Sequence, residues 1–356
     1  MNNRPRRNIV TTKTSGSELS GVLETIAAGL SLVMARPYLV VLPIVIDLIT
    51  WLGFQFSAIS LIDPLRRLMI ENGGANGPAA SRELEGLGER LRVNDMLAAL
   101  TPSVFGGLPK DSFLNLLLAV IAPPVTRGID RTEMYGSWGN GLTDVQDPGS
   151  WFAILGVATG FFALATFLIV LFRVPIARSV RGDDDRVPGF LRECIDAWAR
   201  LVMLGLLFVA TAVLVVGPLL IGVGVLVLLG IDLTAMVAIA LFIFGGMIAL
   251  YTFFALDAMF IARLGPVASL RMSVTVVKRN MGPTARFALA TIIMATGALQ
   301  IWSTIVQNTP GIFIALIGNA VLGTGLSIAS MMFFHDRFQT LPVEPTGRTV
   351  PATSRR

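Results

Sequence analysis

Six long apolar runs constrain this chain more than any other feature of its sequence. They cover residues 37–62, 151–172, 201–229, 233–262, 287–306 and 311–334. A bilayer core about 30 Å thick requires roughly 20 residues of α-helix, and every run reaches that length. Only 14% of the residues are charged, which is too few to cover the surface of a soluble protein of this size. We therefore predict an all-α integral membrane protein with six transmembrane helices.

The short segments between the runs predict the orientation of the chain. Arg and Lys are concentrated before the first run, between the second and third, and between the fourth and fifth, whereas the turns 230–232 and 307–310 carry neither. Because basic residues beside the spans favour the cytoplasmic side, we expect a multi-pass protein of the cell membrane with both termini in the cytoplasm. Residues 63–150 then form an extracytoplasmic helical and loop segment, in which Leu84, Leu87 and Leu91 recur at helical spacing.

Each odd-numbered run is preceded by an amphipathic segment, near residues 17–34, 187–199 and 266–279. The apolar stripes are Leu19, Val22, Leu23, Ile26, Leu30 and Val33; Val187, Phe190, Leu191, Cys194, Ile195 and Trp198; and Val267, Leu270, Val274 and Val277. A helix with one apolar and one basic face lies in the membrane interface. We therefore predict three modules, each an in-plane helix followed by a transmembrane hairpin.

These patterns divide the chain into five parts. Residues 1–14 and 336–356 are rich in Arg, Pro and Thr, and we expect them to be disordered cytoplasmic tails. Residues 15–62 hold the first in-plane helix and span one, and residues 63–150 form the external segment. Residues 151–335 hold spans two to six with two further in-plane helices.

Three stretches carry a resemblance to a known group of proteins. They are "ASLRMSVTVVKRNMGPTARFALATIIM" at 268–294, "GLSLVMARPYLVVLPIVIDLI" at 29–49 and "FLRECIDAWARLVMLGLL" at 190–207. They resemble bacterial six-span membrane proteins related to the membrane domain of glycerophosphoryl diester phosphodiesterases, over residues 17–62 and 151–335. The resemblance implies no catalytic residue here, because no phosphodiesterase domain follows span six. The long segment 63–150 departs from the short hairpin expected in the first module.

Residues that carry enzyme chemistry are scarce. His335 is the only histidine and Cys194 the only cysteine, which excludes a histidine triad, a multi-histidine metal site and an intrachain disulfide. Glycines at 156–160, 222–224 and 323–325 lie inside apolar runs, where small residues let helices approach. The "DDD" at 183–185 is more typical of a solvated helix start than of a cation site. We expect no catalytic residue, cofactor, metal or nucleic-acid partner.

Asp47 is the acid that lies deepest in an apolar run, within "VVLPIVIDLITW" at 40–51. Counting 1.5 Å per residue from Arg36 places it about 16 Å into the bilayer, where an acid is costly unless it is neutral, hydrogen-bonded or facing water. It is either a structural residue that ties span one to its neighbours or a carrier of ions or protons. Asn319 and Asp257 are two weaker intramembrane polar sites; Asp257 lies near the cytoplasmic boundary, with Arg263 following within two turns.

These observations leave two main hypotheses of function. The leading one is a non-enzymatic scaffold or interaction partner, whose own partners are the lipid bilayer and other membrane proteins. A formal net charge of +5 favours contact with anionic lipid headgroups. The alternative is a small-solute or proton-coupled transporter that uses Asp47, and an enzyme acting on lipid is the least supported.

Overall fold

The computed structural model describes residues 20–52, 55–56, 66–67, 70–71, 145–146, 151–183, 189–228, 234–306 and 309–341. Its helices are α1 (Val22–Ala35), α2 (Tyr38–Leu52), α8 (Trp151–Arg181), α9 (Phe190–Leu228), α10 (Thr234–Thr252), α11 (Ala255–Ile261), α12 (Pro266–Arg279), α13 (Met281–Ile305) and α14 (Thr309–Gln339). The tail 1–14 and the predicted external helix lie outside the described residues. Residues 336–339, predicted as the start of the second tail, belong instead to α14, which continues to Gln339.

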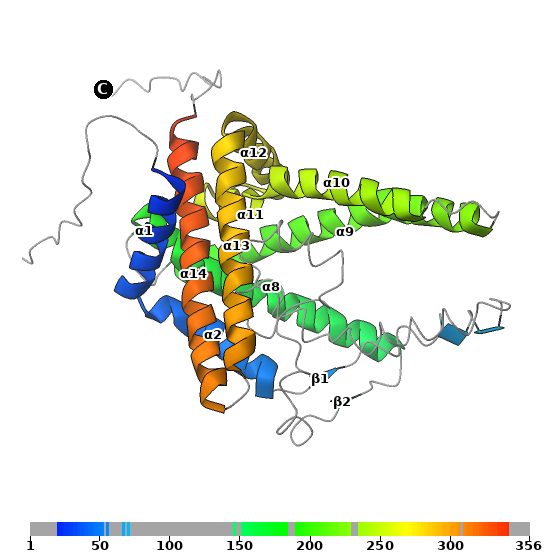
Figure 1. Ribbon diagram of the computed structural model, residues 1–356, viewed down its shortest axis with the longest axis horizontal. Coiled ribbons are helices and arrows are strands. Elements are labelled where there is room, and N and C mark those ends of the chain that lie inside the picture. The colour runs from blue at the N-terminus through cyan, green and yellow to red at the C-terminus, as the bar shows by residue number, and fades with distance from the viewer. Residues whose placement is uncertain are drawn as a thin grey trace, which may run out of the picture.

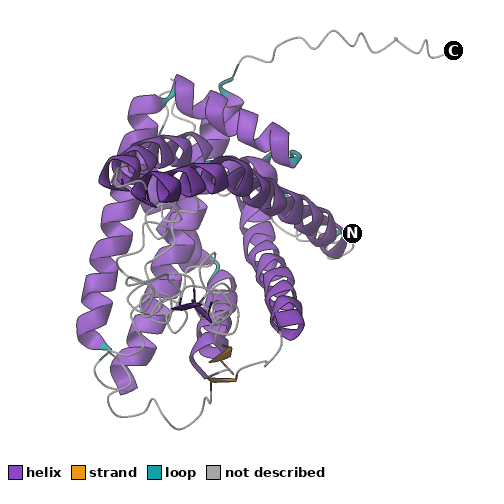
Figure 2. Ribbon diagram, turned by 90° about the vertical axis from the view of Figure 1, so that its right-hand side faces the viewer, coloured by secondary structure: helices purple, strands orange, loops and turns teal. Residues whose placement is uncertain are grey.

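The described part of the chain is helical apart from its connections and two short strands (Figures 1 and 2). The strands β1 (Gln55–Phe56) and β2 (Val145–Gln146) pair in parallel, so two stretches that lie far apart in the sequence come together. Among the described residues four helices are long and apolar enough to cross a membrane, or five if the bent pair α1–α2 counts as one span. The predicted class, an all-α membrane protein, is confirmed.

A sharp bend separates α1 from α2, at an angle of 86°. Arg36 sits in the bend with φ −134° and ψ 68°, because a residue before proline is pushed out of the helical region by the ring of Pro37. The bend therefore lies between the first amphipathic segment and the first apolar run. The third amphipathic segment also forms a helix of its own, α12, which starts with Pro266 and ends at Arg279.

The second amphipathic segment does not form a separate helix, and this expectation was wrong. Residues 190–228 make the single helix α9 of 39 residues, without a break near residue 200. The sequence from Phe190 to Leu204 contains no Gly or Pro, so the change from an amphipathic to an apolar pattern alters the helix surface but not its hydrogen bonding.

The apolar run 233–262, expected as one span, contains a short break at Phe253 and Phe254 that divides α10 from α11. Residues 243–261, which cross this break, still count as one candidate span. The break is held from α12, where the hydroxyl of Ser273 donates to the carbonyl of Tyr251 at 2.8 Å. The same hydroxyl accepts a hydrogen bond from the backbone N–H of Phe254 at 3.1 Å. These bonds satisfy backbone groups that the interrupted helix leaves unpaired.

The helix α14 is the centre of the fold, and it contacts α1, α2, α8, α11, α12 and α13 (Figure 1). So many helices can reach it because its sequence "GNAVLGTGLSIAS" at 318–330 is rich in small residues. The closest approach is to α1, where a Cβ added to Gly29 would lie 2.4 Å from the carbonyl oxygen of Gly325. The glycines at 156 and 160 behave differently, since a Cβ added to either meets no atom within 4 Å.

The apolar stripes of the amphipathic segments are partly buried against protein and partly exposed. Ile26 and Val33 of α1 are buried, as is Cys194 of α9, whereas Leu23 is 75% exposed. Next to them lies an aromatic core, formed by Phe253, Phe254, Phe287, Phe333 and Phe334, all fully buried and in ring–ring contact. The break between α10 and α11 thus places two phenyl rings between α13 and α14.

Candidate functional site

Asp47 and Asn319 are both completely buried, at 0% exposure. Asp47 lies on α2 between Ile44 and Leu48, two residues that pack against a small cluster containing Leu316 of α14. Neither Asp47 nor Asn319 is without an interaction partner. The face of α2 that carries the acid is therefore turned into the protein, as the structural interpretation of Asp47 requires.

Asp257 forms a buried polar cluster that joins three helices. Its Oδ1 accepts a hydrogen bond from Nη1 of Arg173 on α8 at 2.8 Å, and the two side chains are 2% and 4% exposed. Its Oδ2 accepts a hydrogen bond from the hydroxyl of Ser330 on α14 at 2.5 Å. The neighbour in sequence, Arg263, makes its contacts elsewhere, so proximity along the chain did not indicate the partner.

The Arg173–Asp257–Ser330 cluster matters for stability mainly because breaking it would leave an unpaired charge in the protein interior. Taking two charges out of water costs several kcal/mol each, and their attraction with good hydrogen bonding offsets most of that cost. Removing only the carboxylate would leave Arg173 charged and buried, with a penalty of about 3–5 kcal/mol. The cluster therefore fixes how α8, α11 and α14 assemble.

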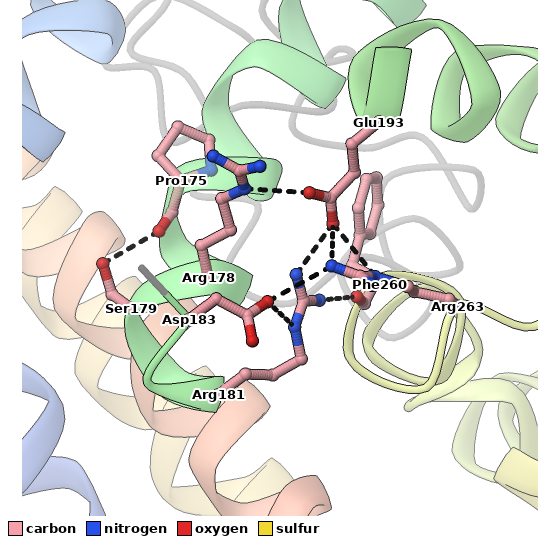
Figure 3. Close-up of polar contacts among 8 residues, drawn as sticks. All are labelled: Pro175, Arg178, Ser179, Arg181, Asp183, Glu193, Phe260 and Arg263. Carbon is pink, nitrogen blue, oxygen red and sulfur yellow. Dashed lines mark hydrogen bonds and ion pairs between the residues drawn. The ribbon is translucent and has the colours of Figure 1, made fainter. Parts of the chain in front are cut away.

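A second charge network joins the α8–α9 connection to the α11–α12 connection (Figure 3). Glu193 at the start of α9 accepts from Nε of Arg178 at 2.8 Å and from Nη2 of Arg181 at 2.7 Å. Arg263 reaches the same carboxylate and that of Asp183, each at 3.2 Å. Asp183 also pairs with Arg181 at 2.7 Å, so this first residue of "DDD" is engaged in ion pairs.

The electrostatics of this network favour the ionised form of Glu193. Burial by itself would raise the pKa of Glu193, but the hydrogen bond and charge from Arg178 and Arg181 outweigh it and lower the pKa below its ordinary value of 4.5. Arg181 also donates to the carbonyl of Phe260 at 2.5 Å. That carbonyl lies in the last turn of α11, where backbone acceptors lack helical partners.

Cys194 and His335 carry the one thiol and the one imidazole of the chain. Burial raises the pKa of the Cys194 thiol to about 11, so it is a protonated, inert side chain at neutral pH. His335 contacts Gln339, its neighbour one turn later on α14, at 3.1 Å. Among the described residues, no group of three or more His, Cys, Asp or Glu side chains is placed to hold a metal ion.

Comparison of the chain with models of protein families, with curated proteins and with solved structures gives no match. Of the members of the polar clusters, the sequence singled out Asp257 but not Arg173, Ser330 or Glu193. The sequence does give one indication that Arg173 is a candidate: it is a charged residue that directly follows an apolar run and precedes Val174 and Pro175.

Proposed function

We propose that the protein is a non-enzymatic, multi-pass protein of the plasma membrane that acts as a scaffold or interaction partner. The observation that carries this proposal is the engagement of both carboxylate oxygens of Asp257, one by Arg173 and one by Ser330. An acid held in this way ties helices together, whereas a transport site needs polar groups that exchange partners. The complete burial of Asp47 supports the same role for the second deep acid.

An exposed pair of helices provides a surface for partners. Figure 1 shows α9 and α10 side by side, extending away from α13 and α14. This α9–α10 arm exposes large apolar side chains, including Leu214 at 74% and Met236 at 72%. Exposed apolar surface of this kind contacts either lipid or another membrane protein, and we propose both lipids and other membrane proteins as partners.

The test measures interaction and transport on the same protein. A photo-crosslinking residue replaces Leu214 on the α9–α10 arm, and the control places it at Met331, which is 0% exposed. We expect discrete protein adducts in native membranes from position 214 only. Purified protein in liposomes with an internal pH-sensitive dye should then show no proton-coupled flux. A flux that Asp47→Asn abolishes would overturn the proposal in favour of a transporter.

We also propose six spans arranged as three hairpins, with both termini in the cytoplasm. The contacts between α2 and α8, between α9 and α10, and between α13 and α14 support the pairing of consecutive apolar runs. Single cysteines at Asn76 and Arg279, in a chain carrying Cys194→Ala, should react with an impermeant maleimide from opposite sides of intact membranes. Asn76 lies outside the described residues. Labelling of both positions from one side would contradict this topology.

A further inference from the structure

We infer that the α12–α13 junction is a binding site for an anionic phospholipid. Four exposed basic residues define this junction site: Arg271, Lys278, Arg279 and Arg286. None of them forms an ion pair with a residue in the described part of the chain. The sequence contains no Asp or Glu between Asp257 and Asp336, so nearby carboxylates along the chain do not neutralise this charge.

Helix geometry gathers the charges of α12 on one side. Arg271, Lys278 and Arg279 are spaced seven and eight residues apart, so they lie on one face of the helix. The opposite face is fixed to the protein, because Ser269, Ser273, Val276 and Val277 are buried and Ser273 bonds to the α10–α11 break. The helix therefore cannot roll to bury its charges without losing these contacts.

The start of α13 places apolar surface directly beyond the charges. Arg286 is followed at helical spacing by Leu289 and Ile293, which are 58% and 61% exposed. Only Asn280 separates the two helices, and Figure 1 shows α12 at the end of α13 where that helix begins. Basic side chains thus stand at the head of an exposed apolar stripe.

This order of charge and apolar surface matches a phospholipid and not a soluble anion alone. Guanidinium and ammonium groups bind phosphate oxygens with charge-assisted hydrogen bonds, and the stripe beyond Arg286 offers contact for an acyl chain. With four cations and no acid, the junction site favours a headgroup with net negative charge over a zwitterionic one. The inference deepens the proposed contact with lipid headgroups and rests on the chain being embedded in a membrane.

The test uses the full chain in detergent with phosphatidylglycerol or phosphatidylcholine added, and native mass spectrometry to count bound lipids. We expect wild type to retain phosphatidylglycerol preferentially, and Arg271→Gln, Lys278→Gln and Arg279→Gln to weaken its apparent affinity by about fivefold for each cation removed. Arg192→Gln is the matched control, because Arg192 is also an exposed arginine of an amphipathic segment. It should leave the preference unchanged.

Two further measurements distinguish a phospholipid from free phosphate as the ligand of the junction site. Inorganic phosphate at millimolar concentration should not displace the lipid, and Leu289→Asn together with Ile293→Asn should weaken lipid retention. The inference would be overturned if the variant that combines the three glutamine substitutions kept its preference for phosphatidylglycerol. It would also be overturned if phosphate displaced the lipid while the two asparagine substitutions had no effect. The number of bound lipids does not depend on which side of the membrane the junction site faces. An unexpected result in the cysteine labelling would therefore not affect this inference.

Discussion

Replacing Gly29 by alanine tests whether α1 is held to α14 by direct backbone contact. The added Cβ would lie 2.4 Å from the carbonyl oxygen of Gly325, 2.8 Å from the backbone nitrogen of Ala329 and 2.9 Å from its Cβ. Ordinary contacts begin near 3.4 Å, and two of these three atoms belong to backbone that cannot rotate away. The helix α1 would therefore have to move off α14 by about 1 Å.

The expected cost follows from two opposing effects. Overpacking a close contact costs about 1–3 kcal/mol, whereas alanine in place of glycine in a helix gains up to about 1 kcal/mol. Gly297 of α13 is the matched control, because a Cβ there meets no atom within 4 Å. Gly297→Ala should keep the gain alone, so the two variants should differ by about 1–3 kcal/mol. Gly325→Ala should lie between them, since its Cβ chiefly meets the flexible side chain of Leu30.

The assay is unfolding by SDS in mixed micelles, followed by tryptophan fluorescence, with all three variants in the same detergent. Gly29→Ala should unfold at the lowest SDS fraction and Gly297→Ala at the highest. If Gly29→Ala unfolded together with Gly297→Ala or later, α1 would not be seated on α14 as described. The central place of α14 in the fold would then lose its main support.

Three other predictions concern single polar or titratable residues. Because the pKa of Glu193 is lowered in the folded protein, its stabilising effect is present above pH 4.5 and lost as the pH falls through the lowered pKa. Thermal unfolding should therefore separate wild type from Glu193→Gln at neutral pH and bring them together in acid; a constant difference would contradict this. Cys194, buried and with a raised pKa, should resist maleimide until the protein unfolds, whereas a cysteine at exposed Arg192 should react at once; equal rates would show that Cys194 is accessible. Asp47→Asn should be tolerated and Asp47→Leu should lower stability in detergent by about 0.6–2 kcal/mol, and equal stability of the two variants would refute a hydrogen-bonding role.

Most of the long helices could be located from the sequence because apolar runs dominate it, although the amphipathic segment at 187–199 is not a helix of its own and continues into α9. The bend at Arg36 was also predictable, since Pro37 acts on the residue directly before it. The break at Phe253 was not, because neither Phe253 nor Phe254 disfavours helix strongly. That break depends on Ser273, which lies 22 residues after Tyr251 and meets it only in the folded protein.

The candidate site was only partly predictable for the same reason. Asp257 and Asp47 stand out as acids in apolar runs, and both are buried. The partner of Asp257 is Arg173, 84 residues earlier, and sequence gives no measure of which helices become neighbours. Proximity along the chain favoured Arg263, but Arg263 follows the end of α11 with a positive φ of 52°, and it contacts Glu193 and Asp183.

The ribosome makes α14 after each of the helices described above as contacting it. About 300 residues separate Gly29 from Gly325, and at roughly 5–20 residues per second their translation takes about 15–60 s. During that time α1 has no α14 to cover Ile26 and Val33, and Asp257 waits for Ser330 although Arg173 has already emerged. The earlier helices must therefore wait in the membrane until α14 is made, so the fold around α14 closes late in synthesis.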